Sequence, residues 1–368
     1  MRWLWGLTFL LACQPDTSPV LRRSSLPAQS AEGFTHRSEQ SHRLELVDGY
    51  AQLELTLPPD TLSLLLEVEG DPDVEYLIHS LVGPQGALVV ESPETEEARA
   101  SQLGAAAGPF FSANRSVAAR GGTTLLAPND PFIEMVGGRY ELGLRSSVNR
   151  HHDVQLNVWV QTGSAYPRRC RVDLHIHRPS SIADDPTREA RILDGVAAME
   201  TIYAAAGIET SVQGFHRHEE LPSRLPSPSE DLEPYSRAFA QGQSGLNLFV
   251  VDALGDEDPP LGGYASAIPL SLRATSSFSG VVVALEFSDP SREADLLGYT
   301  MAHESAHGLG LFHVREFAGW EDPLEDTTPG EGNNLMGVLA RHQDQNLSPS
   351  QALVMRTHPL CVSPGLSD

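Results

Sequence analysis

Hydrophobic and polar positions alternate in short runs over the first half of the chain, from residue 42 to residue 163. The run at 53–57 alternates leucines with polar residues, and 154–160 repeats the pattern. A two-residue period predicts strands that bury one face. Turn signals such as GPQG at 83–86 separate the runs, and no long helical period interrupts them. We therefore expect an antiparallel β-sandwich over 42–163.

After a linker at 164–169, the pattern predicts a mixture of strands and helices. A helix is expected from Pro186, with Asp184 or Asp185 as its N-cap, because apolar residues then recur at helical spacing up to Gly207. The other expected elements are strands at 170–177, 246–254, 262–268 and 280–286, and helices at 294–309 and from Ser348 to about Arg356. We interpret the proline-rich stretch 215–237 as a surface loop. The fold class is therefore α+β, with a second domain over 164–368.

The first residues, 1–13, have the features of an export signal. A ten-residue apolar run follows Arg2, which is too short to span a bilayer and is typical of a signal-peptide core. The sequence LLAC at 10–13 resembles a bacterial lipobox, which implies cleavage before Cys13 and a lipid on that cysteine. An ordinary cleaved signal with an incidental cysteine is the alternative. Residues 14–41 are polar and rich in Ser and Pro, so we expect a disordered tether.

Composition narrows the classes of partner. The chain has 368 residues, enough for two domains, and 40% of them are apolar. Its 49 acidic and 25 basic residues give a net charge of −24. This charge argues against nucleic acid as a partner and against binding to anionic membranes by charge. We expect contact with a membrane only through the lipid, in the bacterial cell envelope, or a secreted protein if no lipid is attached.

The stretch HESAHGLGLFH at 303–313 carries the clearest chemistry. On a helix, His303 and His307 project from one face and can hold one zinc ion. Glu304 lies about 100° round the helix, where it can reach a water bound to the metal. Gly310 allows a turn with positive φ, which brings His313 back as a third ligand. Three imidazoles leave one coordination position open, as in catalytic zinc sites.

This pattern, His-Glu-x-x-His-x-x-Gly-x-x-His, resembles that of the metzincin zinc endopeptidases over roughly residues 170–362. The clan has a methionine turn beneath the zinc, and NNLMG at 333–337 supplies Met336. The resemblance implies hydrolysis of peptide bonds in polypeptides, with Glu304 as general base. The segment after His313 resembles that of pappalysin-like metzincins. Its acidic residues Asp322, Glu325 and Asp326 could bind Ca²⁺. A plain acidic loop is the alternative.

In metzincins a substrate adds as an extra strand to the edge of the sheet above the cleft. By its position, the candidate edge strand lies in 262–268, at Gly263, Tyr264 and Ala265. An interior or solvent-facing strand is the alternative.

Cys170 and Cys361 flank the second domain almost end to end. Domain termini are often close in space, and disulfides persist in exported proteins. We therefore expect a Cys170–Cys361 disulfide.

Other histidines also occur in pairs, which we interpret as chance pairs rather than metal sites; they are His151/His152, His175/His177 and His216/His218. The functional expectation is a zinc endopeptidase at or outside the cell surface. Two alternatives stay open, a catalytically silent relative and a surface-binding or adhesion protein in which the β module is the working part. The intact set of three histidines and Glu304 argues against the first. The β module has no strong aromatic platform to support sugar binding.

Overall fold

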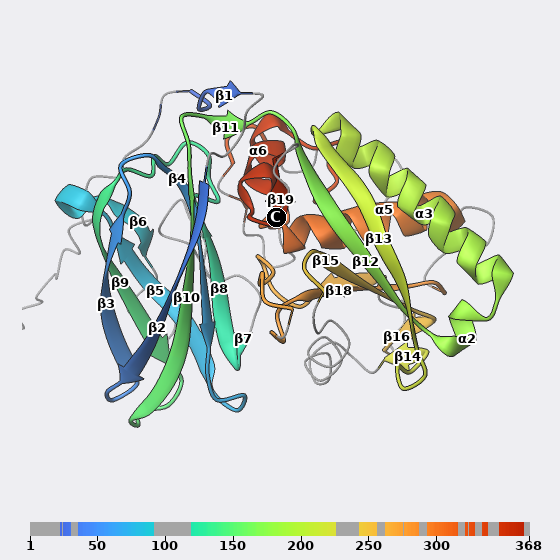
Figure 1. Ribbon diagram of the computed structural model, residues 1–368, viewed down its shortest axis with the longest axis horizontal. Coiled ribbons are helices and arrows are strands. Elements are labelled where there is room, and N and C mark those ends of the chain that lie inside the picture. The colour runs from blue at the N-terminus through green and yellow to red at the C-terminus, as the bar shows by residue number, and fades with distance from the viewer. Residues whose placement is uncertain are drawn as a thin grey trace, which may run out of the picture.

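The structure is a computed structural model of mixed α+β class, in which two bodies lie side by side (Figure 1). It describes residues 23, 25–30, 36–91, 119–225, 243–255, 262–274, 276–286, 293–315, 321–322, 324–327, 333–337 and 346–363. Cys13 and the expected export signal lie outside these residues. Within the described residues, no helix is both long and apolar enough to cross a membrane.

The first body is one antiparallel sheet, which has nine strands within the described residues. The strands are β2 (His36–Leu46), β3 (Tyr50–Leu57), β4 (Thr61–Glu69), β5 (Glu75–Val82), β6 (Leu88–Glu91), β7 (Ala119–Arg120), β8 (Gly122–Ala127), β9 (Gly138–Ser146) and β10 (His152–Thr162). Their order is β2-β10-β4-β8-β7-β5-β9-β3, with β6 beside β5. The two ends of this path, β2 and β3, are joined by a tight turn bridged between Val47 and Tyr50. The expected sandwich is thus a single sheet that folds over one core.

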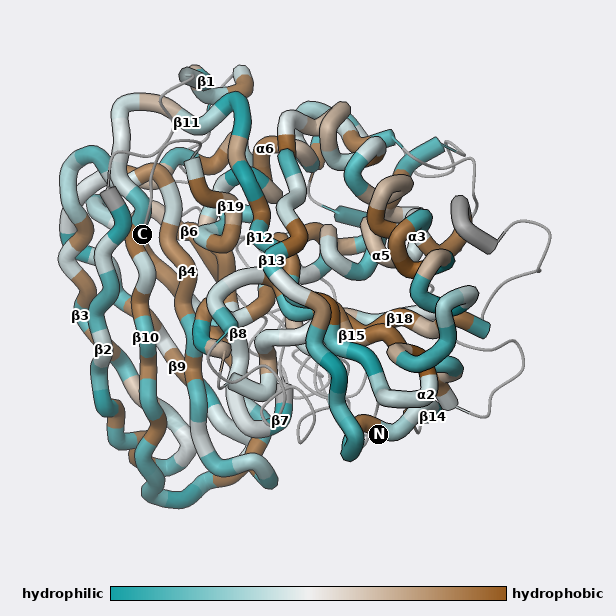
Figure 2. Tube along the Cα trace, turned by 45° about the vertical axis from the view of Figure 1, so that its right-hand side comes forward, coloured by the Kyte–Doolittle hydropathy of each residue, from teal (hydrophilic) through white to brown (hydrophobic). Residues whose placement is uncertain are grey.

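The expected alternation is visible along β3, where Ala51 and Leu55 are buried and Gln52 and Glu54 are exposed. Hydrophilic and hydrophobic positions also alternate along β10 (Figure 2). Strand β4 differs, because all but its last residue are buried. Leu64 and Leu66 enter the core of the sheet, while Ser63 and Glu67 on the other face contact the second body.

The first body begins earlier in the chain than the sequence predicts. Strand β2 starts at His36 and pairs with β10 along its whole length, and β1 (Gln29–Ser30) pairs with β11 (Tyr166–Pro167). Part of the expected tether at 14–41 is therefore extended chain in these sheets. The sequence of β2 is polar because it forms the end of the strand path, where a strand needs few apolar residues.

The second body is built on the sheet β13-β12-β15-β18-β17. Its strands are β12 (Cys170–Pro179), β13 (Ile208–His218), β15 (Leu246–Val251), β17 (Gly263–Ala265), β18 (Gly280–Ala284) and β19 (Cys361–Val362). Strand β19 pairs with β12. Two short strands, β14 (Arg224–Leu225) and β16 (Ala253–Leu254), form a separate pair. Four strands are parallel, and β17 is antiparallel at the end. Strand β13 is absent from the sequence prediction, which placed 215–237 in a loop.

Helices α3 (Pro186–Ala205) and α5 (Glu293–Gly308) pack on one face of this sheet, and α2 (Ser180–Ala183) precedes α3. The Asp185 side chain caps α3, accepting from the backbone N–H groups of Thr187 and Arg188. Helix α6 (Pro349–Thr357) starts with a capping box between Ser348 and Gln351. These caps match the sequence prediction.

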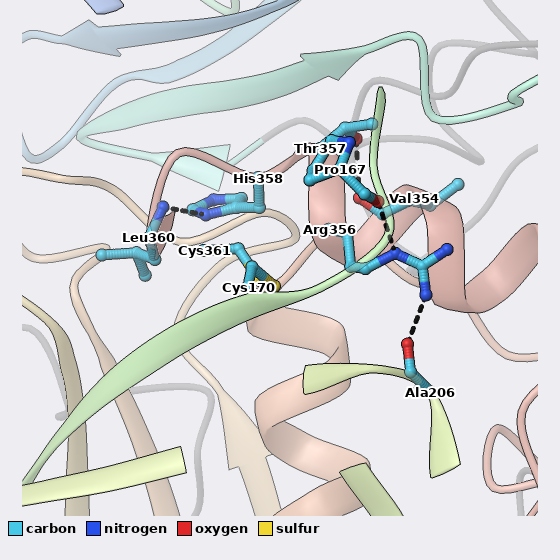
Figure 3. Close-up of a disulfide and its surroundings, with 9 residues drawn as sticks. All are labelled: Pro167, Cys170, Ala206, Val354, Arg356, Thr357, His358, Leu360 and Cys361. Atoms are coloured by element: carbon cyan, nitrogen blue, oxygen red, sulfur yellow. Dashed lines mark hydrogen bonds between the residues drawn. A yellow bond between two sulfur atoms is a disulfide. The ribbon is translucent and has the colours of Figure 1, made fainter. Parts of the chain in front are cut away.

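A disulfide joins Cys170 to Cys361 with 5.4 Å between Cα atoms, as the sequence predicts (Figure 3). It links the first strand of the second body to its last. Nearby, the buried Arg356 donates hydrogen bonds to the carbonyl oxygens of Pro167, at 3.1 Å, and of Ala206. The C-terminal helix is thus tied to the start of the domain.

The two bodies share a packed interface. Thr124 donates a hydrogen bond to the Pro269 carbonyl at 2.6 Å, and Ser63 donates one to the Thr357 carbonyl at 3.1 Å. Leu126 of β8 is fully buried and belongs to the core of the second body. The first body therefore supports the second directly.

Candidate metal centre

Helix α5 and the turn that ends it position three histidines together. His303 and His307 lie one turn apart in the last part of α5. The helix ends at Gly308, and Gly310 follows with φ +103°, a conformation that L side chains rarely adopt. This turn sends the chain back so that His313 reaches the other two rings.

The three imidazoles converge through their Nε2 atoms. His313 Nε2 lies 3.2 Å from His303 Nε2 and 3.1 Å from His307 Nε2. Within the described residues, this is the only group of three His, Cys, Asp or Glu side chains with ligand atoms within 4.8 Å of one another. The structure therefore brings together the three ligands that the sequence predicts.

Backbone carbonyls set the tautomer of the two buried rings. His303 Nδ1 lies 2.6 Å from the Leu335 oxygen, and His307 Nδ1 lies 2.7 Å from the Leu311 oxygen. A carbonyl oxygen only accepts, so each Nδ1 carries the hydrogen and each Nε2 presents a lone pair. His313 can offer at most one Nε2 hydrogen to these two lone pairs. A cation satisfies all three nitrogens, and a carbonyl partner on the other nitrogen is typical of metal-binding histidines.

Burial also keeps two of the rings uncharged. It lowers the pKa of His303 to about 3 and the pKa of His307 well below its ordinary value, and the neighbouring His313 lowers both further. A metal ligand must be neutral imidazole. The residues present therefore fit a zinc ion, because three imidazole nitrogens suit zinc and, within the described residues, no fourth His, Cys, Asp or Glu side chain joins the group.

We call His303, His307 and His313 the histidine triad. Glu304 lies between this triad and the edge strand β17. Its side chain is buried, and burial raises the pKa of its carboxyl to about 8, while a hydrogen bond from the Ala265 backbone N–H lowers that pKa. A cation held by the triad would lower the pKa again. A Cβ on Gly263 would lie 2.7 Å from Glu304 Cγ, so the strand passes directly against this side chain.

The register of β17 leaves one edge open. Ser266 donates to the Gly280 carbonyl and Ala284 donates to the Gly262 carbonyl. Hydrogen-bonded and non-bonded pairs alternate in an antiparallel ladder, so the backbone groups of Gly263 and Ala265 point away from β18. Within the described residues, no strand pairs with this outer edge. The expected edge strand is thus at the end of the sheet and beside Glu304.

Leu335 and Tyr299 link the segment 333–337, the expected methionine turn, to the metal centre. Met336 is fully buried in the core, and the carbonyl of its neighbour Leu335 accepts from His303. The Tyr299 hydroxyl donates to the same carbonyl at 2.7 Å, and its ring stacks on His303. Sequence reasoning missed Tyr299, although its position one turn before His303 was a usable signal. The backbone carbonyls of Leu311 and Leu335 leave no trace in a sequence.

The acidic residues considered for Ca²⁺ have other partners. Asp326 accepts from Ser348 Oγ and from the Ser350 backbone, at the start of α6. Asp322 accepts from the Leu324 backbone N–H and from the Thr327 hydroxyl. These contacts favour the plain-loop alternative.

No family model matches the chain, and no curated protein matches it. Among solved structures, metalloproteinase-II from Bacteroides fragilis matches at 17% identity with a TM-score of 0.35, covering 53% of this chain and 54% of its own. The match therefore spans about half the length of that protein. A likeness at this level does not establish a common fold, and the function proposed below rests on the metal centre.

Proposed function

We propose that the chain is a zinc-dependent endopeptidase. The observation that carries this proposal is the convergence of three imidazole nitrogens beside the buried carboxyl group of Glu304. A structural zinc site needs four protein ligands, whereas a set of three leaves room for water. A binding protein or a silent relative would have no need of a carboxylate at this place.

The roles of the residues follow from their positions. His303, His307 and His313 would hold zinc, which when bound supplies an activated water and a Lewis acid. Glu304 would take a proton from that water on its carboxylate and return it to the nitrogen of the leaving amine. Met336 is buried in the core of the second body and would contribute packing rather than a ligand.

The substrate class follows from the open edge of β17. An extended polypeptide can pair with the outward backbone groups of Gly263 and with the Ala265 carbonyl, because such pairing recognises the main chain rather than particular side chains. This edge supports the proposal of a polypeptide substrate, whose backbone would lie beside Glu304.

We propose further that the enzyme acts outside the cytoplasm, attached to the cell envelope by a lipid on Cys13 or else secreted. The Cys170–Cys361 disulfide is compatible with an oxidising compartment. The alternative in which the β module is the working part gains no support from the described residues, since that module packs into the core of the second body.

The test is cleavage of an unfolded protein by the zinc-loaded chain and by its Glu304→Gln variant, with zinc measured on both. We expect the variant to keep its zinc and to cut at least about 100-fold more slowly, since a general base contributes at least this factor. Glu54→Gln, the same change at an exposed strand position, is the control and should cut normally. If both proteins hold zinc and neither cuts, a silent or binding protein becomes the better account.

A further inference from the structure

Four histidines of two adjacent strands lie together on the second body, at a distance from the metal centre along the sheet. We call His175 and His177 of β12 and His216 and His218 of β13 the histidine quartet. The parallel register sets His177 opposite His216 and Pro179 opposite His218, so all four rings share one face of the sheet. Residues at the alternate positions, such as Ile176, enter the core with α3 and α5. The quartet is therefore on the face that these helices do not cover.

The quartet consists of two close pairs of rings. His175 Nδ1 lies 3.1 Å from His216 Nε2, and His177 Nδ1 lies 2.9 Å from His218 Nε2. These distances match the 3.1 and 3.2 Å between ring nitrogens of the histidine triad. The ring of His177 also stacks on His216 and on Phe249, which holds it in place.

In each pair the buried ring, His175 or His177, also bonds an acceptor oxygen through its second nitrogen, as the buried rings of the triad do. His175 Nε2 lies 3.1 Å from the Ser244 carbonyl oxygen, and His177 Nε2 lies 2.9 Å from Asn247 Oδ1. Both oxygens accept, so both Nε2 atoms carry the hydrogen and both Nδ1 atoms present lone pairs to their partners. Oriented imidazoles of this kind are typical metal ligands.

Access and charge also suit a cation. His175 and His177 are buried, whereas His216 and His218 are partly exposed, so the pairs can be reached from solvent. Burial lowers the pKa of His177 to about 3 and, together with the neighbouring histidines, lowers the pKa of His216 and of His218. Burial therefore favours the neutral form of His177, His216 and His218. The net charge of −24 concentrates cations around the protein.

We propose that the histidine quartet is a second metal site, which takes one divalent ion of the Cu²⁺, Ni²⁺ or Zn²⁺ class through one of its histidine pairs. Imidazole suits these ions. The ion replaces the shared hydrogen between the two rings, and that hydrogen moves to Nδ1 of His216 or His218, with no net loss of a proton. The sequence suggested only chance pairs, because β13 was not predicted and the register that joins them was therefore not visible.

The stoichiometry and strength follow from the geometry. The stacked rings of His177 and His216 are 4.7 Å apart, so ions in both pairs would repel strongly, and we expect one ion per quartet. Within the described residues, no third side chain joins a pair closely enough to form a group like the triad. Water completes the coordination, and we expect micromolar affinity, weaker than at the triad.

The test uses the untagged full chain carrying His303→Ala and His307→Ala, which removes the triad and makes the result independent of the proposed peptidase activity. Copper(II) chloride is titrated by calorimetry, and the bound Cu²⁺ is examined by electron paramagnetic resonance. We expect one Cu²⁺ per chain with hyperfine splitting from two imidazole nitrogens. Adding His216→Gln and His218→Gln should weaken binding about 10-fold or more. His151→Gln, at an exposed position, is the control and should change nothing.

Unchanged affinity in the His216→Gln/His218→Gln chain, or a spectrum without two imidazole nitrogens, would overturn the proposal and leave an ordinary hydrogen-bonded set of histidines. If the chain without the triad does not fold, the same two substitutions are made in the otherwise unaltered chain. Its bound copper should then fall from two ions per chain to one while zinc-dependent cleavage persists. A copper count that stays at two, or that starts at one, contradicts the proposal.

Discussion

Tyr299 and Leu335 hold the metal centre at the scale of single residues. The Leu335 carbonyl accepts from both His303 and the Tyr299 hydroxyl, so the tyrosine fixes the group that orients a ligand. Removing such a support weakens metal binding about 10-fold or more. We therefore expect Tyr299→Phe to lower zinc affinity by about that factor and stability by about 1 kcal/mol.

The measurement is zinc affinity by competition with a chromogenic chelator, together with urea unfolding. Tyr166→Phe is the matched control, because its buried hydroxyl donates to the Leu62 carbonyl at the same 2.7 Å but has no link to the triad. The control should lose stability and keep its zinc affinity. Equal zinc affinities for wild type and Tyr299→Phe would show that the hydrogen bond has no part in holding the metal.

The motif at 303–313 predicted all three ligands because their spacing is written in one short stretch. The supports of the site were harder to predict. Leu311 and Leu335 act through backbone carbonyls, which every residue has, so no sequence pattern singles them out.

At the scale of elements, strand β17 determines access to Glu304. A Cβ on Gly263 would lie 2.7 Å from Glu304 Cγ and 2.8 Å from the Val282 carbonyl oxygen. We expect Gly263→Ala to shift the strand and lower kcat/KM about 10-fold or more, since small misplacements near the chemistry cost this much. Zinc affinity should be unchanged.

Kinetics and zinc titration of Gly263→Ala separate these effects. Gly86→Ala is the control, since its Cβ would meet nothing within 4 Å, although its φ of +77° brings backbone strain of its own. It should cleave as well as wild type. Full activity in Gly263→Ala would place the substrate elsewhere.

Elements with a clear period or cap were predictable, as α3, α5, α6 and β12 illustrate. Strand β13 was not, for two physical reasons. It lies at the end of the sheet, where many residues are partly exposed on either face, and a register shift between Leu174 and His175 interrupts its pairing with β12. The histidine quartet depends on that pairing.

At the scale of the whole molecule, Glu67 connects the two bodies. It lies in β4 of the first body, is fully buried, and accepts a hydrogen bond from Ser271 of the second. Burial raises the pKa of Glu67 to about 7. The sequence predicted two modules but not this contact, because apolar strands that face a neighbouring module have the same pattern as strands buried within one.

The raised pKa sets the sign of a pH effect. A carboxyl with a pKa of about 7 in the folded chain and an ordinary value near 4.5 when unfolded stabilises the fold fully below pH 4.5, and this contribution is lost as the pH rises through 7. Glutamine cannot ionise and still accepts from Ser271. We therefore expect Glu67→Gln to be more stable than wild type at pH 8.5 by roughly 2 to 3 kcal/mol and little different at pH 4.5.

Urea unfolding at the two pH values tests this expectation. Glu54→Gln, on an exposed strand position, should show no such pH-dependent gain. A variant that is less stable than wild type at pH 8.5 would mean that Glu67 is held as a charged partner across the interface.

The central claim is that the histidine triad holds a zinc ion with one position open, and zinc K-edge X-ray absorption of the chain loaded with one equivalent of zinc measures this directly. The account predicts three imidazole nitrogens and one oxygen, at about 2.0–2.1 Å. His313→Ala should remove one imidazole from this set. A zinc ion surrounded by four protein ligands, or a chain that binds no zinc, would contradict the account.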